Sequence, residues 1–342
     1  MHKKKPTTVL AGGVAAIAIA LALSGCSGSG PAEGAAAVGA KKAIVIAEPV
    51  HGIGYLPLYV AIDEGYFADA GLDVSASTLT GGAHVNAVLT GDAWGFIGGI
   101  ESAAIANAKG AQLEAVAGVV DRANIYWVAR KGVDIDPDDI AGSLKGLTIA
   151  ASRHAGSVEI DTLYYLKKLG LDPTKDVTIL NNDNGTELSV LSSKQADVAA
   201  TSEPNLGQGI TQGVWGEPFV NLPDALGKFA YSDIVTSKAN TKDDPKTVQK
   251  FVDALGKGMD DVLDNRKVAE KVAAKEFPNM APDVIKATLD RAYADKLWDG
   301  VEIAPEAVDT DLKVARDAGL LDDAASPATF DSIVNDEFFT KD

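Results

Sequence analysis

The sequence predicts an α/β fold in which mostly parallel sheets are flanked by helices. Three observations support this. Short apolar runs alternate with helix-length segments between residues 43 and 129, a similar series follows between residues 147 and 222, and everything after Asp244 has a helical pattern. Roughly 300 residues in two such series suit two domains better than one.

The first series begins with residues 43–47 (AIVIA), an uninterrupted apolar run that is typical of a buried strand. Residues 56–68 follow with the length of a helix, and residues 72–79 alternate between apolar and polar side chains, as a strand does. The same criteria predict strands at 94–97, 113–120 and 125–129 and helices at 83–89 and 101–109. This alternation favours parallel pairing with helices on both faces of the sheet.

A break containing Gly132 and Pro137 separates the first series from the second. Beyond it we predict strands at 147–151, 177–180, 198–201 and 218–222, with helices at 157–169 and 186–193. A last strand is predicted at 231–236, followed by helices at 245–263, 267–276, 282–295 and 305–318. Because this tail contains no further strand pattern, we expect it to pack around an existing sheet.

The first 25 residues have the layout of a secretory signal: a basic patch, an uncharged run at 9–23, and small residues before Cys26. That run is shorter than the roughly 20 residues that span a bilayer. Residues 23–26 (LSGC) resemble a bacterial lipobox, which implies that Cys26 is lipidated and becomes the first mature residue. The alternative is an ordinary secretory signal beside a stray thiol, although Cys26 is the single cysteine of the chain.

Residues 27–40 are small and show no apolar periodicity, so we expect 26–40 to be the lipidated cysteine and a flexible tether that reaches about 20 Å. The protein is then held at the outer face of the cell membrane. Its formal net charge is −17, and it becomes −20 once residues 1–25 and their three lysines are removed. A body this acidic repels nucleic acid, which excludes a nucleic-acid partner.

A series of short segments in a fixed order resembles the solute-binding proteins of ABC importers for nitrate, sulfonates, taurine and hydroxymethylpyrimidine. The segments are 57–61 (PLYVA), 64–67 (EGYF), 71–74 (GLDV), 144–150 (LKGLTIA), 169–173 (LGLDP) and 196–200 (ADVAA), the last followed by Glu203-Pro204. No single segment is specific, but their order is.

The resemblance implies a type II periplasmic-binding-protein-like fold with two lobes. Lobe one would comprise residues 41–130 plus 232–342, with the helical C-terminal region packed on it, and lobe two residues 131–231. The chain would cross between them at 129–132 and 230–237. Ligand would lie in the cleft, at the carboxyl ends of strands, and the lobes would close about a hinge.

The resemblance also implies the function: capture of a small organic solute and delivery to the permease of an ABC importer, by a monomer that needs no cofactor. A sensor lipoprotein is an alternative. An enzyme similar to the pyrimidine synthases of the thiamine pathway is a weaker alternative. Those proteins are cysteine-rich around an iron site, whereas Cys26 is the single cysteine of this chain. We expect no metal site, because His51, His84 and His154 lie on separate loops without ligand spacing.

Loops that follow a strand and begin a helix present free backbone N–H groups, which suit an anion. Four such loops, at 48–55, 80–84, 98–101 and 152–157, supply these candidate ligand-binding residues: His51, Tyr55, Gly82, Gly99, Glu101, Arg153, His154, Gly156 and Ser157. The last loop gathers the most donors, and a guanidinium there suits a carboxylate or a sulfonate.

Three further candidates follow other strands: Arg122, which could close on the ligand from lobe one, and Ser202 and Glu203. Each has a simpler interpretation, such as a surface ion pair for Arg122 or a helix cap for Ser202. We therefore expect an anionic ligand, and keep a neutral pyrimidine-like or aromatic heterocycle as the alternative.

Overall fold

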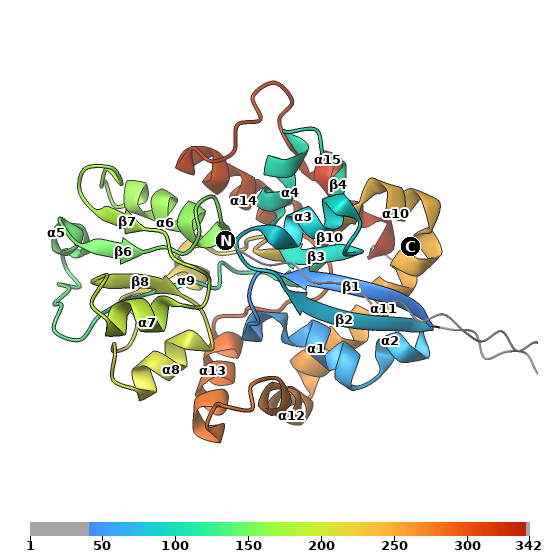
Figure 1. Ribbon diagram of the computed structural model, residues 1–342, viewed down its shortest axis with the longest axis horizontal. Coiled ribbons are helices and arrows are strands. Elements are labelled where there is room, and N and C mark those ends of the chain that lie inside the picture. Colours follow the sequence, from blue (N-terminus) through green and yellow to red (C-terminus); the bar gives the residue numbers. More distant parts are fainter. Residues whose placement is uncertain (1–40, 340–342) are drawn as a thin grey trace, which may run out of the picture. The chain divides into compact units, whose positions relative to one another are not determined.

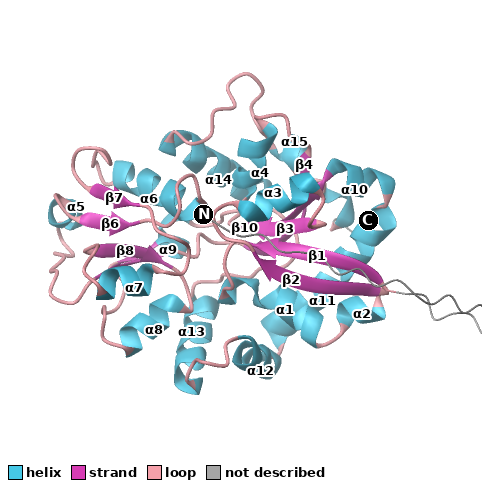
Figure 2. Cartoon of the chain, viewed as in Figure 1, coloured by secondary structure: helices cyan, strands magenta, loops and turns pink. Residues whose placement is uncertain are grey.

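The computed structural model describes residues 41–339, and the predictions for the signal, for Cys26 and for the tether lie outside these residues. The described residues belong to one compact unit that contains two sheets flanked by helices (Figures 1 and 2). The predicted mixed α/β fold class is therefore confirmed.

The first sheet has the strand order β2-β1-β3-β10-β4. Its strands are β1 (Lys42–Glu48), β2 (Leu72–Thr78), β3 (Gly95–Gly98), β4 (Leu113–Val120) and β10 (Ser232–Ser237). Strands β1, β2 and β3 pair in parallel, whereas β10 is antiparallel to both β3 and β4. The alternating apolar runs of the sequence therefore lie where they were predicted.

The second sheet repeats this arrangement in the order β7-β6-β8-β5-β9. Its strands are β5 (Tyr126–Ala129), β6 (Thr148–Ala150), β7 (Thr178–Leu180), β8 (Val198–Thr201) and β9 (Val220–Asn221). Here β5 is the reversed strand, antiparallel to both β8 and β9. In each sheet the reversed strand comes from a part of the chain remote from its neighbours.

Strand β5 corrects one expectation. The first crossing between the sheets lies at residues 121–125 and not at 129–132, because β5 already pairs with β8 and β9. The apolar run at 125–129 indicated a strand correctly, but an apolar run carries no information about which sheet will bury it. The second crossing lies between β9 and β10, at residues 222–231, and so overlaps only the beginning of the expected 230–237.

Helices cover both faces of each sheet (Figure 2). Those of the first sheet are α1 (Leu56–Asp63), α2 (Tyr66–Asp69), α3 (Ala83–Thr90) and α4 (Ile100–Asn107), preceded by the short η1 (Ile53–Tyr55). The helix predicted at 56–68 is divided into α1 and α2 because Gly65 takes a left-handed conformation, with φ of 81°. The second sheet carries α5 (Ile140–Leu144), α6 (Ser157–Lys168), α7 (Glu187–Ser192), α8 (Asn205–Thr211) and α9 (Leu222–Leu226).

The C-terminal segment is helical, as predicted. It contains α10 (Lys238–Asp243), α11 (Pro245–Asp264), α12 (Arg266–Glu276), α13 (Pro282–Ala294), α14 (Pro305–Ala318), α15 (Phe330–Ile333) and η2 (Asp336–Phe338). Helix α11 packs its apolar face on α1 and α2, and Gly258 allows the closest approach, since a Cβ there would lie 2.4 Å from the Pro57 carbonyl oxygen. Buried side chains such as Phe251 and Leu255 each contribute roughly 1.5–3 kcal/mol to this packing.

Two helices of this segment also reach the second sheet. Helix α14 packs against α6 as well as α4, and α13 packs against α8. The tail therefore forms two seams between the sheets in addition to packing around the first one. No helix of residues 41–339 has the combination of length and apolar character that a membrane crossing requires.

Candidate ligand-binding site

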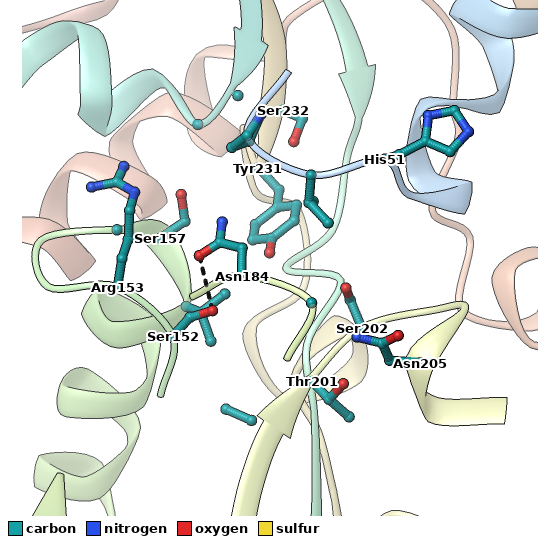
Figure 3. Close-up of a pocket in the computed structure, with 18 of the residues that line it drawn as sticks. His51, Ser152, Arg153, Ser157, Asn184, Thr201, Ser202, Asn205, Tyr231 and Ser232 are labelled. Carbon is teal, nitrogen blue, oxygen red and sulfur yellow. Dashed lines mark hydrogen bonds between the residues drawn. The ribbon is translucent and has the colours of Figure 1, made fainter. Parts of the chain in front are cut away.

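A cavity of about 310 Å³ lies where loops of the two sheets meet (Figure 3). Its walls are the segments that follow β1, β2, β3, β6, β7 and β8, together with Tyr231 and with Ser232 at the beginning of β10. This is the carboxyl-terminal edge of the parallel strands, where open α/β sheets bind their ligands. The volume falls at the lower end of the range for small-molecule sites.

The wall from the first sheet is built of aromatic rings and backbone. Tyr55 and His84 are buried, with exposed fractions of 7% and 2%, and Gly98 and Gly99 bring the backbone to the surface of the cavity. Burial, together with the nearby Arg153 guanidinium, lowers the pKa of His84 to about 3, so this imidazole is neutral at physiological pH. Its Nδ1 atom has no hydrogen-bond partner within the described residues.

His51 lines the same wall but has charged partners. Its Nδ1 lies 3.0 Å from Glu48 Oε1, and its Nε2 lies 3.5 Å from a carboxylate oxygen of Glu276. The hydrogen bond to Glu48 raises the pKa of His51 above its ordinary value, and burial opposes this. The ring is therefore held between two acidic groups and is less available to an anion than the sequence suggested.

The wall from the second sheet is polar. Ser152 donates from Oγ to Asn184 Oδ1 at 3.0 Å and to Glu187 Oε1 at 3.1 Å, and its backbone has a φ of 61° (Figure 3). Ala155, in the same loop, has a φ of 54°. Two non-glycine residues in the left-handed region indicate a loop that the surrounding contacts hold in a strained shape, as is common at functional sites.

Arg153 is the cation of this loop. Its guanidinium donates to the carbonyl oxygens of His154 and Ala155, at 3.3 and 3.2 Å. These acceptors are neutral, so the positive charge is half-buried, and no carboxylate of residues 41–339 is in contact with it. Burial lowers the pKa of Arg153, and Glu101 and Glu159 oppose this from a distance. A half-buried guanidinium with neutral neighbours can take an anionic group of a ligand.

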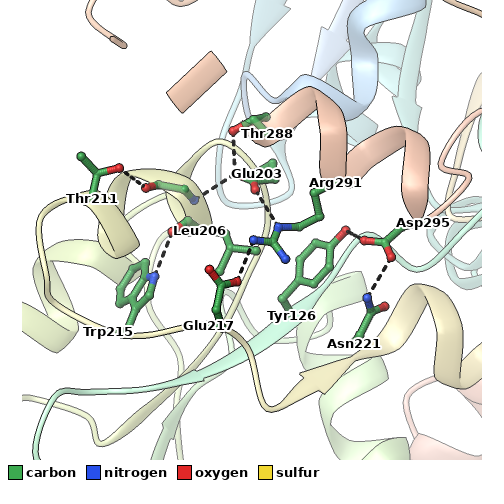
Figure 4. A network of polar contacts seen from close by, with 11 residues as sticks. Tyr126, Glu203, Leu206, Thr211, Trp215, Glu217, Asn221, Thr288, Arg291 and Asp295 are labelled. Atoms are coloured by element: carbon green, nitrogen blue, oxygen red, sulfur yellow. Dashed lines mark hydrogen bonds and ion pairs between the residues drawn. The ribbon is translucent and has the colours of Figure 1, made fainter. Parts of the chain in front are cut away.

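The carboxylates that line the cavity are already engaged. Glu187 accepts from Ser152, from Asn205 and from the backbone N–H of Gly185. Glu203 is 1% exposed and accepts from the Gly207 backbone N–H and from side chains of α13 (Figure 4). These groups shape the cavity more than they offer it a free negative charge.

Most of the predicted residues meet in the cavity. His51, Tyr55, Gly99, Arg153, Gly156, Ser157, Ser202 and Glu203 all line it. The prediction that they contact the ligand remains a prediction. Residues that the sequence reasoning did not select also line it, including Ser102, Ser152, Asn184, Thr201, Asn205, Tyr231 and Ser232, as well as His84. Asn184 follows β7 and Thr201 ends β8, so the same strand-end rule could have found them.

Four candidates do not line this cavity. Gly82 faces Arg153 from a neighbouring hollow between α3 and α4, where a Cβ would lie 3.5 Å from Nη1. Arg122 turns back to the carbonyl oxygen of Asp121 at 3.3 Å. The ring of His154 is 72% exposed and pairs with Glu159. The sequence placed Arg122 and His154 on loops near the cavity but did not fix the direction of their side chains.

Glu101 is the fourth, and it is fully buried behind the wall. Its carboxylate folds back over Gly99, where a Cβ would lie 1.9 Å from Oε2. Ser157, which does line the cavity, donates from Oγ to Glu101 Oε1 at 2.6 Å. Glu101 therefore positions a wall residue of the second sheet from a helix of the first sheet.

Among residues 41–339, no group of three or more His, Cys, Asp or Glu side chains is arranged so that it could hold a metal ion. The histidines that line the cavity also lack a hydrogen bond to any Ser or Thr hydroxyl among these residues, since His51 bonds to Glu48 and His84 Nδ1 has no partner. The arrangement of these side chains is that of a polar binding pocket.

The architecture and the cavity together define a type II periplasmic-binding-protein-like fold. A family model described as NMT1/THI5 like matches residues 53–269, which is more than half of the chain. The chain belongs to the NMT1/THI5-like family.

Known proteins are similar over most of their length. YtlA of Bacillus subtilis (strain 168), which is named as a binding protein, is 28% identical over 254 residues, covering 72% of this chain and 75% of YtlA. The ligand-binding component of an ABC-type import system from Staphylococcus aureus, solved with zinc bound, superimposes with a TM-score of 0.73 at 15% identity, over 87% of this chain and 98% of its own.

The alkanesulfonate-binding protein SsuA from Xanthomonas axonopodis pv. citri, solved bound to MOPS, superimposes with a TM-score of 0.70 at 19% identity, over 88% of this chain and 100% of its own. At these identities the two solved structures establish the shared fold. Their ligands are properties of those proteins.

Proposed function

We propose that this protein captures a small solute in the cavity between its two sheets and delivers it to the permease of an ABC importer. The observation that carries the proposal is the cavity itself, which is ligand-sized and lined by strand-end loops of both sheets. Membership of the NMT1/THI5-like family and the names of the similar proteins support it. Binding rather than catalysis is proposed, because the similar proteins are named as binding proteins and neither histidine of the cavity contacts a Ser or Thr hydroxyl among residues 41–339.

The two sheets with their helices act as two lobes in this proposal. We assign residues 41–120 and 232–339 to lobe one and residues 126–221 to lobe two, with the connections at 121–125 and 222–231 as the hinge. This keeps the division expected from the sequence and moves its first boundary to where β5 changes sheet. Small-angle scattering should show compaction when the ligand is added, and an unchanged radius of gyration with bound ligand would contradict closure.

We further propose that the solute carries an anionic group, such as a sulfonate or a carboxylate, held by Arg153 and the beginning of α6. Support comes from the half-buried guanidinium whose contacts are neutral carbonyl oxygens. Ser157 begins a twelve-residue helix beside it, whose first backbone N–H groups suit an anion, whereas the N–H of Gly156 already donates to the Arg153 carbonyl oxygen at 3.2 Å.

A thermal-shift panel of sulfonates, carboxylates and pyrimidines tests the ligand class. The right compound at about 100 times its Kd stabilises the folded protein by roughly 2.7 kcal/mol. Arg153→Ala should then remove about 2 kcal/mol or more of binding free energy, which weakens affinity at least about 30-fold. His154→Ala is the matched control, because its ring belongs to the same loop but is exposed.

A neutral heterocycle is the second candidate. Tyr55, Tyr231 and the neutral His84 line the cavity and can stack on or hydrogen-bond to a flat ring. If Arg153→Ala binds the wild-type ligand with unchanged affinity, or if only uncharged heterocycles stabilise the protein, the anion proposal fails and this one replaces it.

The anchor is also a proposal. We propose that lipid on Cys26 holds the protein at the outer face of the membrane, on the basis of the lipobox-like residues 23–26. Cys26→Ala should release the protein from membranes or stop its processing. Normal processing and membrane retention of this variant would show that the lipoprotein assignment is wrong.

A further inference from the structure

Four carboxyl groups lie together directly behind the cavity wall. They belong to Glu101 on α4, Asp161 on α6, Asp233 on β10 and Asp311 on α14, and their exposed fractions are 0%, 1%, 2% and 1%. We call these four residues the carboxyl cluster. Its members come from both sheets, since α6 belongs to the second sheet while α4 and β10 belong to the first.

The donors that contact the carboxyl cluster are neutral. Asp311 accepts from the backbone N–H of Glu101 at 3.4 Å, and Glu101 Oε1 accepts from the hydroxyls of Ser102 and Ser157 at 3.1 and 2.6 Å. One carboxylate oxygen each of Glu101, Asp161 and Asp233 has no partner at all within residues 41–339. The charges that act most strongly on Asp161, Asp233 and Asp311 are those of other carboxylates.

Four ionised carboxylates are not stable in such a place. Each buried charge without a cation costs several kcal/mol, and neighbouring like charges add to that cost. Asp161, Asp233 and Asp311 avoid this cost by holding protons, because burial followed by the neighbouring carboxylates raises the pKa of each well above its ordinary value. A carboxylic acid also gains an O–H donor, which can supply a hydrogen bond to an otherwise unpartnered oxygen.

The carboxyl cluster lies on a surface that opening of the lobes would separate. Helix α14 packs along α6, and at one end of this contact Lys167 of α6 donates to the Asp317 carbonyl oxygen at 2.6 Å. At the same seam, the Lys313 ammonium lies 5.4 Å from the centre of the Tyr164 ring. When α6 moves away from α4 and α14, water reaches the carboxyl groups and they can ionise near their ordinary values.

We propose that the closed form of this protein binds protons at the carboxyl cluster, so that protons act as co-ligands of closure. The inference rests on the two-lobe closure proposed above. Glu101 links the cluster to the cavity, because its partner Ser157 belongs to the wall that holds the solute. Solute capture is then coupled to proton uptake, and opening releases the protons to the surrounding water.

Other titratable groups face the carboxyl cluster. Tyr55, which is buried, and Tyr231, which is partly buried, lie beside it with raised pKa values and so remain neutral. Asp121 raises the pKa of Asp233 from the neighbouring crossing. Arg153 is the cation near Glu101, and the Glu101 carboxylate opposes the lowering of the Arg153 pKa by burial. Because the charges acting on Asp161, Asp233 and Asp311 are all acidic, the direction of the coupling is determined.

The direction of the pH effect on closure follows from the raised pKa values of Asp161, Asp233 and Asp311. An acid whose pKa is higher in the closed form than in the open form favours the closed form at low pH, and this preference is lost as pH rises from about 4 towards the raised value. In that window the ratio of closed to open molecules falls about tenfold per pH unit for each proton bound.

Small-angle scattering of the full chain with Cys26→Ala, without any solute, tests the proposal between pH 5 and pH 8. The radius of gyration should be smaller at pH 5 than at pH 8. Asp311→Asn keeps the shape of the side chain and removes one proton-binding group, so its closed form should persist to higher pH. Asp317→Asn, on the exposed side of the same helix, should behave like the unmodified protein.

Asp161→Asn repeats the test from the other helix, and circular dichroism identifies any variant that does not fold. A radius of gyration that is the same at every pH would overturn the proposal. So would Asp311→Asn and Asp161→Asn variants that open over the same pH range as the unmodified protein. Closure at pH 8 on addition of Na⁺ or Ca²⁺ would overturn it as well, because the carboxyl cluster would then hold a cation. No solute is present, so the result is independent of the ligand-binding assay.

Discussion

Two seams join the sheets of this molecule, and they treat buried carboxylates in opposite ways. At the α13 seam, Glu203 is 1% exposed and accepts hydrogen bonds from the Gly207 backbone N–H, from Thr288 and from Arg291, at 3.0, 3.1 and 3.3 Å (Figure 4). At the α14 seam, the equally buried Asp161, Asp233 and Asp311 have no such cation within the described part of the chain. The same side-chain chemistry at the same depth is therefore stabilised by a guanidinium in one seam and by protons in the other.

The α13 seam continues as a chain of polar contacts. Arg291 also donates to Glu217 at 2.9 Å, and Asp295 accepts from Tyr126 of β5 at 2.6 Å and from Asn221 of β9 at 2.9 Å (Figure 4). Burial still raises the pKa of Glu203, but Arg291, Thr288 and the Gly207 N–H oppose the rise. From this comparison we expect the contacts of the α14 seam to respond mainly to pH. Those of the α13 seam should respond mainly to the removal of one partner of an ion pair or hydrogen bond.

The largest expected effect concerns pH and Asp121, whose charge acts on Asp233. Burial and the nearby Asp299 raise the pKa of Asp121 to about 7, and Lys228 and Arg122 oppose this. The folded state therefore holds a proton that the unfolded state releases above pH 4. Stability from this group is complete below about pH 4 and is lost as pH rises to about 7, by on the order of 4 kcal/mol.

Urea unfolding of the unmodified protein and of Asp121→Asn, measured from pH 4 to pH 8, isolates this effect. The difference in unfolding free energy should change with pH in favour of the variant. Two parallel curves would show that Asp121 titrates normally in the folded protein.

At the α13 seam, we expect Arg291→Met to lower the unfolding free energy by about 3 kcal/mol at pH 7, because Glu203 keeps a buried charge without its cation. Glu217→Gln is the matched control. The side chain of Glu217 is the other partner of Arg291 and is 70% exposed. Its replacement should therefore change the unfolding free energy by less than about 1 kcal/mol. Equal losses in the two variants would remove the distinction between buried and exposed partners.

A pair of identical substitutions compares the seams directly. Glu203→Gln breaks an ion pair and should destabilise the protein at pH 8 by about 2 kcal/mol. Glu101→Gln keeps an acceptor for Ser157 while removing one acid from the carboxyl cluster, so we expect it to be neutral or stabilising there. Chemical denaturation at pH 8 measures both, and a larger loss for Glu101→Gln would reverse the comparison.

The smallest effect concerns Glu48, another buried carboxylate, which has a partly exposed histidine as its partner. The pKa of His51 is raised by its hydrogen bond to Glu48, so the stability this pair contributes is complete below about pH 6.5 and is lost as pH rises through the raised value. Because the His51 side chain is 33% exposed, solvent screens the pair and we expect less than about 1 kcal/mol. Unfolding of His51→Gln at pH 6 and pH 8 checks it, and a loss that grows with pH would contradict the sign.

The secondary structure could be predicted closely from the sequence because each strand and helix buries one face of its own. The run at 113–120 and that at 198–201 correspond to β4 and β8 at both ends. The short helices α5, α8, α9 and α10 were missed because a segment of five to seven residues has too few positions for a periodicity to stand out. The candidate loops were found because ligand sites follow strand ends, which periodicity locates.

The sequence by itself determined the class of fold, the succession of elements and the loops that line the cavity. These follow from local apolar patterns, which fix where a strand or helix begins and ends. Only the tertiary structure decided that β5 joins the second sheet, that Arg122 turns away and that Glu101 lies behind the wall. Each of these depends on contacts between residues far apart in the chain, such as Tyr126 with Thr201 or Glu101 with Asp311, and no local pattern specifies such a contact.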